Sequence, residues 1–123
     1  MKLDNYDKVP GCTMYAALNL ISGKWKGVIL YYLLQSGTLR FNALNRKLPD
    51  CSQRLLIKQL RELEEDGLVA RTVYAVVPPR VDYSITEEGR TLEPILMGLR
   101  DWGHSWLKRR NLTARDDHFV LPK

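Results

Sequence analysis

At 123 residues, with 45% hydrophobic and 27% charged side chains, the chain has the length and composition of one globular domain, which excludes a second ordinary domain and an intrinsically disordered chain. Its 19 basic and 14 acidic residues give a net charge of +5, which favours a polyanionic partner without identifying one. The longest apolar run, Val28 to Leu34, is far shorter than the about 20 residues of a membrane helix, and residues 1–11 lack the apolar centre of a signal peptide, so we expect a cytoplasmic protein without a membrane partner.

The N-terminal part of the sequence predicts two helices. From Thr13 to Ile21, and again from Trp25 to Gln35, apolar residues recur at steps of three and four, which is the spacing of one helix face. Gly23 follows the first segment and Gly37 follows the second, and glycine commonly ends a helix. Residues 1–11 precede these helices as an N-terminal arm.

Two more helices are predicted before the pattern changes. The first runs from Phe41 to Leu48 and ends there because the residue before Pro49 avoids the α region. The second runs from Gln53 to Asp66, since the Ser52 hydroxyl is a typical N-cap and Gly67 is a typical stop. This last segment also has leucines at helical spacing, which predict its buried side.

After Gly67 the sequence reads as two strands. β-branched and aromatic residues fill Val69 to Val76, and apolar residues alternate with polar ones from Val81 to Ile85. The two prolines between these segments cannot donate to a sheet ladder, so they belong to a loop. We therefore predict an antiparallel hairpin with Arg80 at its tip.

A last helix is predicted from Thr86, a typical N-cap residue, to about Arg110. Pro94 removes one backbone donor inside this segment, so we expect a bend there. Residues 111–123 have no sustained period and are predicted to form a tail. The helix has an apolar stripe that is either a contact with a second copy or core packing, and it comprises Leu92, Ile95, Leu96, Leu99, Trp102 and Trp106.

Charge is segregated along the segment from Arg40 to Asp66. At 100° per residue, the cations Arg54, Lys58 and Arg61 point away from the leucines of their helix. Acids follow these cations, and acids at a helix C-terminus oppose the helix dipole, so helix stability does not explain the order. A nearby phosphate backbone would explain it. The alternative is an ordinary solvated face whose charges pair along the helix.

Short helices, a two-stranded hairpin and a further helix are the order of a winged helix-turn-helix, a mainly α fold in which a later helix enters the major groove of DNA. The first turns of this helix read base edges, so we assign that role to Gln53 and Arg54, with Ser52 in the same interface. Arg80 is assigned to a minor groove or a phosphate. The other cations assigned to the DNA backbone are Lys24, Lys26, Arg40, Lys58 and Arg61.

Several ordered motifs between Cys12 and Gly103 resemble the HxlR-type (DUF24) bacterial transcription regulators, relatives of the MarR group. The motifs are Gly23-Lys24-Trp25-Lys26, Arg40-Phe41-Asn42-Ala43-Leu44, Ser52-Gln53-Arg54-Leu55-Leu56, Gln59-Leu60-Arg61-Glu62-Leu63-Glu64-Glu65-Asp66-Gly67-Leu68-Val69 and Val77-Pro78-Pro79-Arg80-Val81-Asp82-Tyr83-Ser84-Ile85-Thr86. The resemblance implies a homodimer that joins through its terminal helices and regulates genes from a palindromic operator. Two-fold symmetry would then place the recognition helices about 34 to 36 Å apart.

The two cysteines lie just before predicted helices. The positive end of a helix dipole favours a thiolate, and Cys12 matches the position at which family members carry a redox-active cysteine. A small oxidant or electrophile is therefore a candidate effector, acting through an adduct on Cys12 or a disulfide from Cys12 to the partner subunit's Cys51. Both cysteines are candidate redox residues, and a buried, inert cysteine is the alternative reading.

Other functional classes find little support in the sequence. The glycines form no phosphate-binding loop, and the cysteines and histidines have no metal-ligand spacing, so we expect no enzyme, cofactor or metal site. The stronger rival to DNA binding is a non-enzymatic interaction module that docks an acidic protein on the same basic face. Salt dependence of duplex binding separates the two readings.

Overall fold

The computed structural model of the chain describes residues 12–114, and within them it has six helices and three strands. Their order is α1 (Thr13–Ile21), α2 (Lys26–Ser36), β1 (Thr38–Arg40), α3 (Phe41–Lys47), α4 (Gln53–Glu65), β2 (Val69–Tyr74), β3 (Arg80–Ile85), α5 (Glu87–Arg90) and α6 (Glu93–Arg109). The predicted arm and residues 115–123 of the predicted tail lie outside the described residues. None of the helices in the described part is long and apolar enough to cross a membrane.

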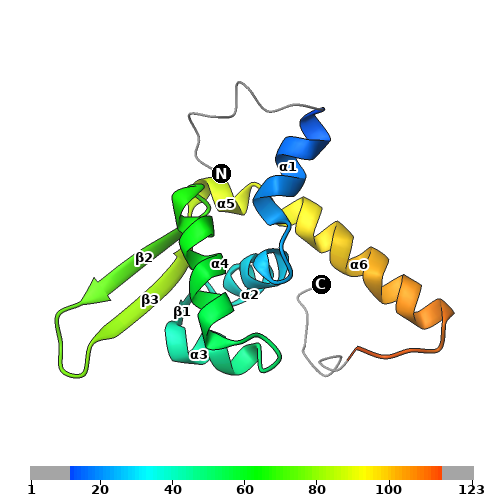
Figure 1. Cartoon of the computed structure of the whole chain (residues 1–123). Coiled ribbons are helices and arrows are strands. Elements are labelled where there is room, and N and C mark those ends of the chain that lie inside the picture. The colour runs from blue at the N-terminus through cyan, green and yellow to red at the C-terminus, as the bar shows by residue number, and fades with distance from the viewer. Residues whose placement is uncertain (1–11, 115–123) are drawn as a thin grey trace.

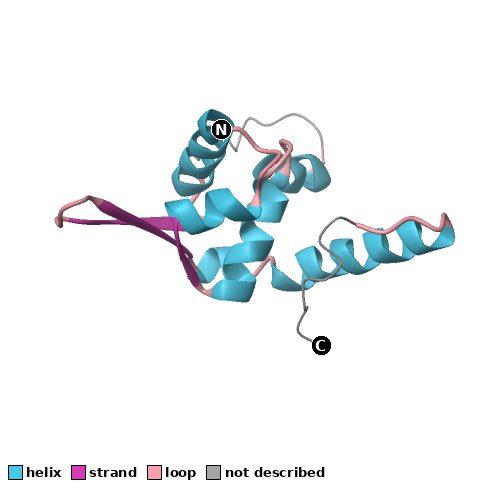
Figure 2. Ribbon diagram, turned by 90° about the horizontal axis from the view of Figure 1, so that it is seen from below, coloured by secondary structure: helices cyan, strands magenta, loops and turns pink. Residues whose placement is uncertain are grey.

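The elements separate into a hairpin side and a terminal-helix side. In Figure 1, α2, α3 and α4 form the middle of the molecule, the β2–β3 hairpin extends from one side of it, and α1 and α6 lie on the other. Figure 2 shows from below that the hairpin and the long helix point in opposite directions. A mainly α fold with a small hairpin, as predicted, is confirmed. We call the β2–β3 hairpin the wing.

The core lies between α2, α3 and α4. Leucine and isoleucine side chains of these helices are fully buried, and each contributes about 1.5 to 3 kcal/mol relative to an exposed position. They are Ile29, Leu30, Leu33, Leu44, Leu56, Leu60 and Leu63. Because three of them lie on α4, this helix keeps its leucine side inward and its other side in solvent.

A third strand, β1, was not predicted from the sequence. It pairs antiparallel with β3, so the sheet order is β1-β3-β2, and its register places Leu39 opposite Tyr83 and Arg40 opposite Asp82. A strand of three residues between two helices has no readable period, and only its partner in the fold defines it. The strand ties the base of the wing to α3 and fixes the backbone of Arg40.

Two predicted helix caps are confirmed. The Ser52 hydroxyl accepts a hydrogen bond of 3.1 Å from the Leu55 N–H at the start of α4. The Thr86 hydroxyl accepts one of 3.0 Å from the Gly89 N–H and donates one of 2.7 Å to the Gly67 carbonyl. Thr86 therefore starts α5 and also holds the end of α4, since it satisfies a backbone group just past that end.

The single bent helix predicted from Thr86 to Arg110 is wrong. The chain forms the short helix α5, leaves it at Arg90, and starts α6 at Glu93. Pro94 lies in the first turn of α6, where its missing N–H has no partner to lose. Pro94 therefore begins a new helix and does not bend a longer one. The spacing of apolar residues does not distinguish one bent helix from two successive helices.

Gly89 occupies a position where a larger residue does not fit. A Cβ at this position would contact the Leu68 carbonyl oxygen and lie 2.6 Å from Ile85 Cγ1. Gly89→Ala is therefore expected to lower the free energy of unfolding by about 1 to 3 kcal/mol, measured by urea denaturation. Gly98→Ala is the control, because its added methyl group would meet no atom within 4 Å apart from its chain neighbours and the backbone of its own helix. Equal urea midpoints for the two variants would contradict the packing.

Candidate nucleic-acid interface

The side of α4 that faces solvent carries the predicted cations. Arg54, Lys58 and Arg61 are exposed, while the leucines of the same helix are buried, so their predicted outward direction is confirmed. Gln53 and Ser52 are also exposed at the N-terminal end of the helix. We call Arg54, Lys58 and Arg61 the basic face of α4.

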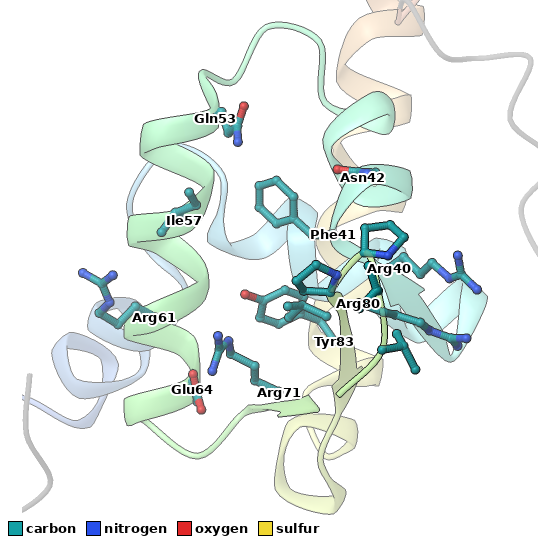
Figure 3. A pocket seen from close by; sticks show the side chains of 15 residues that line it. Arg40, Phe41, Asn42, Gln53, Ile57, Arg61, Glu64, Arg71, Arg80 and Tyr83 are labelled. Carbon is teal, nitrogen blue, oxygen red and sulfur yellow. The ribbon is translucent and has the colours of Figure 1, made fainter. Parts of the chain in front are cut away.

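The wing and α4 border a cleft of about 850 Å³ (Figure 3). Four arginines from four elements line it, namely Arg61 of α4, Arg71 and Arg80 of the two wing strands, and Arg40 of β1. The acid in its lining is Glu64, so the cleft carries a positive net charge. Its other lining residues are Phe41, Asn42, Gln53, Ile57, Val76, Val77, Pro78, Pro79, Val81 and Tyr83.

Arg71 is a candidate interface residue that sequence analysis missed. It lies on β2 opposite Tyr83, it is exposed, and Figure 3 shows its side chain beside Glu64 at the α4 side of the cleft. The type of a lone arginine does not indicate which face of a predicted strand its side chain occupies. Only the pairing of the two wing strands indicates this face, since it places Arg71 opposite Tyr83 on the same side of the sheet.

The sequence predicts Arg80 at the tip of the wing, and this is wrong. It is the first residue of β3, and its guanidinium donates from Nε to Asp82 Oδ1 at 3.1 Å and from Nη2 to Oδ2 at 2.9 Å. The guanidinium also lies 4.7 Å from the centre of the Tyr74 ring. The hydrogen bonds from Arg80, followed by the charges of Arg80 and Arg40, lower the pKa of Asp82. Arg80 is therefore held against the wing beside the cleft.

Lys26 was predicted to contact DNA, and the structure contradicts this. Its side chain is only 9% exposed, and its Nζ lies 2.9 Å from Glu62 Oε1. The hydrogen bond from Lys26 lowers the pKa of Glu62, so this carboxylate stays charged beside it. Spacing alone did not reveal that this cation has an internal partner. Lys24 and Arg40, in contrast, are exposed.

The two cysteines have opposite environments. Cys12 is exposed at the N-cap of α1, where the backbone N–H groups of Tyr15 and Met14 lower the pKa of its thiol. Cys51 is buried, its Sγ donates to the Ser52 carbonyl at 3.5 Å, and burial raises the pKa of its thiol. The lowered pKa of the Cys12 thiol agrees with the prediction that the helix N-terminus favours a thiolate there, whereas burial dominates at Cys51.

Alkylation rates should report this difference. Because its pKa is lowered, Cys12 is expected to react with iodoacetamide at a pH where an ordinary thiol is still mostly protonated. Cys51 is expected to react only after the chain is unfolded in urea, since it is buried. Mass spectrometry of peptides after timed alkylation across the neutral pH range measures both rates. Equal rates in the folded protein would contradict these environments.

The predicted apolar stripe of α6 divides between core and surface. Leu96 is 4% exposed and Leu92 packs against the core, so these two are not free to form a dimer contact. The half-buried Trp106 has the Arg110 guanidinium 4.0 Å from its ring centre. Ile95, Leu99 and Trp102 are 53%, 55% and 63% exposed, and Met14 and Leu18 of α1 are exposed too. We call these five exposed residues the apolar face.

Comparison with known proteins decides the family. A family model described as HxlR-like helix-turn-helix matches residues 20–111. The chain belongs to the HxlR-like helix-turn-helix family. A relative of this HxlR-like chain in Bacillus subtilis, the HTH-type transcriptional regulator YdeP, is 48% identical over 103 residues, which cover 84% of this chain and 80% of YdeP.

Solved structures of other regulators share the fold of the HxlR-like chain. The redox regulator HypR in its reduced form is 50% identical with a TM-score of 0.73, covering 76% of this chain and 92% of HypR. The HTH-type regulator YtcD is 45% identical with a TM-score of 0.74, covering 80% and 99%. Diamide-treated YodB from B. subtilis is 31% identical with a TM-score of 0.64, covering 79% and 96%. The HxlR-like chain is therefore a winged-helix transcription regulator and not an enzyme.

Proposed function

We propose that this HxlR-like regulator binds a palindromic operator as a homodimer, with α4 of each copy in the major groove of one half-site. The observation that carries the proposal is the basic face of α4 beside the positively charged cleft. Gln53 and Arg54 lie in the first turn of α4, which reaches base edges in this geometry. Glutamine pairs with adenine and arginine with guanine, each contributing about 1 to 3 kcal/mol of discrimination.

The remaining exposed cations would hold the sugar-phosphate backbone. Lys58 and Arg61 lie farther along α4, and Arg71 and Arg40 approach the cleft from the sheet. Lys24 is exposed in the turn between α1 and α2. Such contacts orient a protein on the duplex but carry no sequence information by themselves. The cleft between α4 and the wing would then receive one strand of the duplex.

The apolar face supplies the proposed dimer contact. Five large apolar side chains on α1 and α6 are exposed in a single chain, and contact of apolar side chains with water is unfavourable. Figure 1 shows α1 and α6 on the side away from the wing, so a second copy bound there leaves α4 and the wing free. A two-fold axis through this face would give two outward basic faces for two half-sites.

Cys12 is the proposed attacking thiol of a redox response. Its thiolate would react first with a peroxide to give a sulfenic acid, and the thiol of the partner subunit's Cys51 would then displace water to form a disulfide. Cys51 is buried in the single chain and its thiol has a raised pKa, so it must become exposed and deprotonated before it can resolve the sulfenic acid. HypR is described as a redox regulator, which supports the proposal. The test compares the operator affinity of the parent chain and of Cys12→Ser before and after treatment with diamide. If diamide changes both affinities equally, Cys12 has no part in the redox response.

Duplex selection followed by salt titration tests the DNA proposal. The full chain selects duplexes from a random pool, and the affinity of the selected duplex is measured at several salt concentrations. We expect a palindromic sequence and a logarithmic salt slope of about −0.9 for each neutralised phosphate. A chain that enriches no sequence and binds duplex no better than an acidic protein would contradict the proposal and favour the interaction module.

A further inference from the structure

The buried side of α4 contains polar contacts that packing alone does not require. Gln59 is 6% exposed among leucines, and its Oε1 accepts a hydrogen bond of 3.3 Å from the Trp25 N–H. One turn farther along α4, Glu62 pairs with the nearly buried Lys26. Both contacts join α4 to adjacent residues at the start of α2, its N-cap Trp25 and its first residue Lys26.

The local sequence in the turn between α1 and α2 accommodates the contact. Gly23 has a φ of +85°, which favours glycine, and a Cβ at this position would lie 3.0 Å from Gln59 Nε2. Lys26 is the first residue of α2, where a cation opposes the helix dipole. A buried cation at that end is therefore explained by its partner on α4 and not by the stability of α2.

We infer that Gln59 and the Lys26–Glu62 ion pair are positioning residues that hold α4 at a fixed orientation to the start of α2, which a short turn joins to α1. This rests on the proposed function, in which α1 belongs to the dimer contact and α4 reads DNA. In that dimer the distance between the two copies of α4 must match the spacing of the half-sites. A polar contact is directional, so it restricts rotation and sliding of α4 more narrowly than leucine packing does. The contacts therefore set which half-site spacing the dimer accepts.

Operators with altered spacing test this inference. The probes are the duplex that the parent selects from a random pool and two derivatives with one base pair added or removed between the half-sites. We expect the parent to bind both derivatives roughly tenfold more weakly, a loss typical of one wrong base pair. Gln59→Leu is expected to reduce that penalty to within about threefold while its discrimination against a substituted base within a half-site stays unchanged.

Controls separate positioning from general stability. Gln35→Leu removes a glutamine whose Nε2 contacts Met97 Sδ of α6 and not α4, and it should keep the spacing penalty. Glu62→Gln is compared with Glu65→Gln, because Glu65 is exposed and has the same charge on the same helix. Thermal melting monitored by circular dichroism confirms that each variant is folded. If Gln59→Leu does not fold, the double variant Lys26→Met with Glu62→Leu replaces it, since an apolar pair keeps the packing.

The outcomes distinguish this inference from the proposed function. A parent that selects no duplex would overturn both. A parent that discriminates spacing, with folded Gln59→Leu and Glu62→Gln variants that discriminate it equally well, would overturn the positioning role and leave DNA binding intact. Loss of base and spacing discrimination together would assign Gln59 a purely structural role and would also overturn the inference.

Discussion

Replacing Leu99 with glutamate is expected to separate the proposed homodimer into monomers and to weaken operator binding by about a thousandfold or more. Leu99 lies at the centre of the α6 part of the apolar face and is more than half exposed in the single chain. A carboxylate there costs little in a monomer, because water still solvates it, but it would be buried without a partner in the dimer. A monomer then contacts only one half-site.

Sedimentation and duplex binding measure the two parts of this prediction. Sedimentation velocity gives the oligomeric state, and fluorescence anisotropy with the selected duplex gives the affinity. His104→Glu is the matched control, because His104 is exposed on α6 and lies about 140° around the helix from Leu99. A Leu99→Glu variant that sediments as the parent does would contradict the assignment of the apolar face.

Arg54→Ala is expected to abolish discrimination at one base pair of each half-site, which corresponds to about 1 to 3 kcal/mol for each copy of α4. Arg54 is exposed in the first turn of α4, so its removal takes away a donor to a base edge and leaves the core unchanged. The measurement is the ratio of affinities for the selected duplex and for duplexes substituted at single positions. Unchanged ratios at every position would contradict the role of Arg54.

Lys58→Ala is the comparison for Arg54→Ala on the same helix. Lys58 lies one turn farther along α4 and is exposed, so its ammonium is expected to meet a phosphate. Its loss should weaken binding to all sequences about equally and reduce the magnitude of the salt slope by about 1. Reversed behaviour of the two variants would mean that α4 lies in the groove in the opposite direction.

Local signals in the sequence predicted much of the fold. The leucine spacing and the Ser52 cap defined α4, and the Thr86 cap defined the start of α5, because a helix and its cap are short-range features. The strand β1 was missed because three residues have no period and its partner β3 lies far along the chain. Pro94 was assigned to the interior of a helix because a proline indicates an interruption of helical structure but not whether it ends one helix or begins the next.

The candidate interface was less predictable than the fold. Exposure of the basic face followed from the leucine stripe on the opposite side of α4. The ion-pair partners of individual charges could not be predicted in this way. The pairs Lys26–Glu62 and Arg80–Asp82 are known only from the folded structure. For the same reason the α6 stripe did not reveal that Leu96 faces the core while Leu99 faces solvent. Residue type and spacing identify a charged or apolar side, and packing decides which of its members remain available.

Mapping the selected duplex onto the chain by NMR tests the central claim most directly. The backbone amide signals of an isotope-labelled protein are followed as the duplex is added. We expect the largest changes at residues 52–61 on α4 and at residues 71–80 on the wing, with Arg54 among the most affected. Changes confined to α1 and α6, with the signals of α4 unmoved at saturating duplex, would contradict DNA recognition by the basic face.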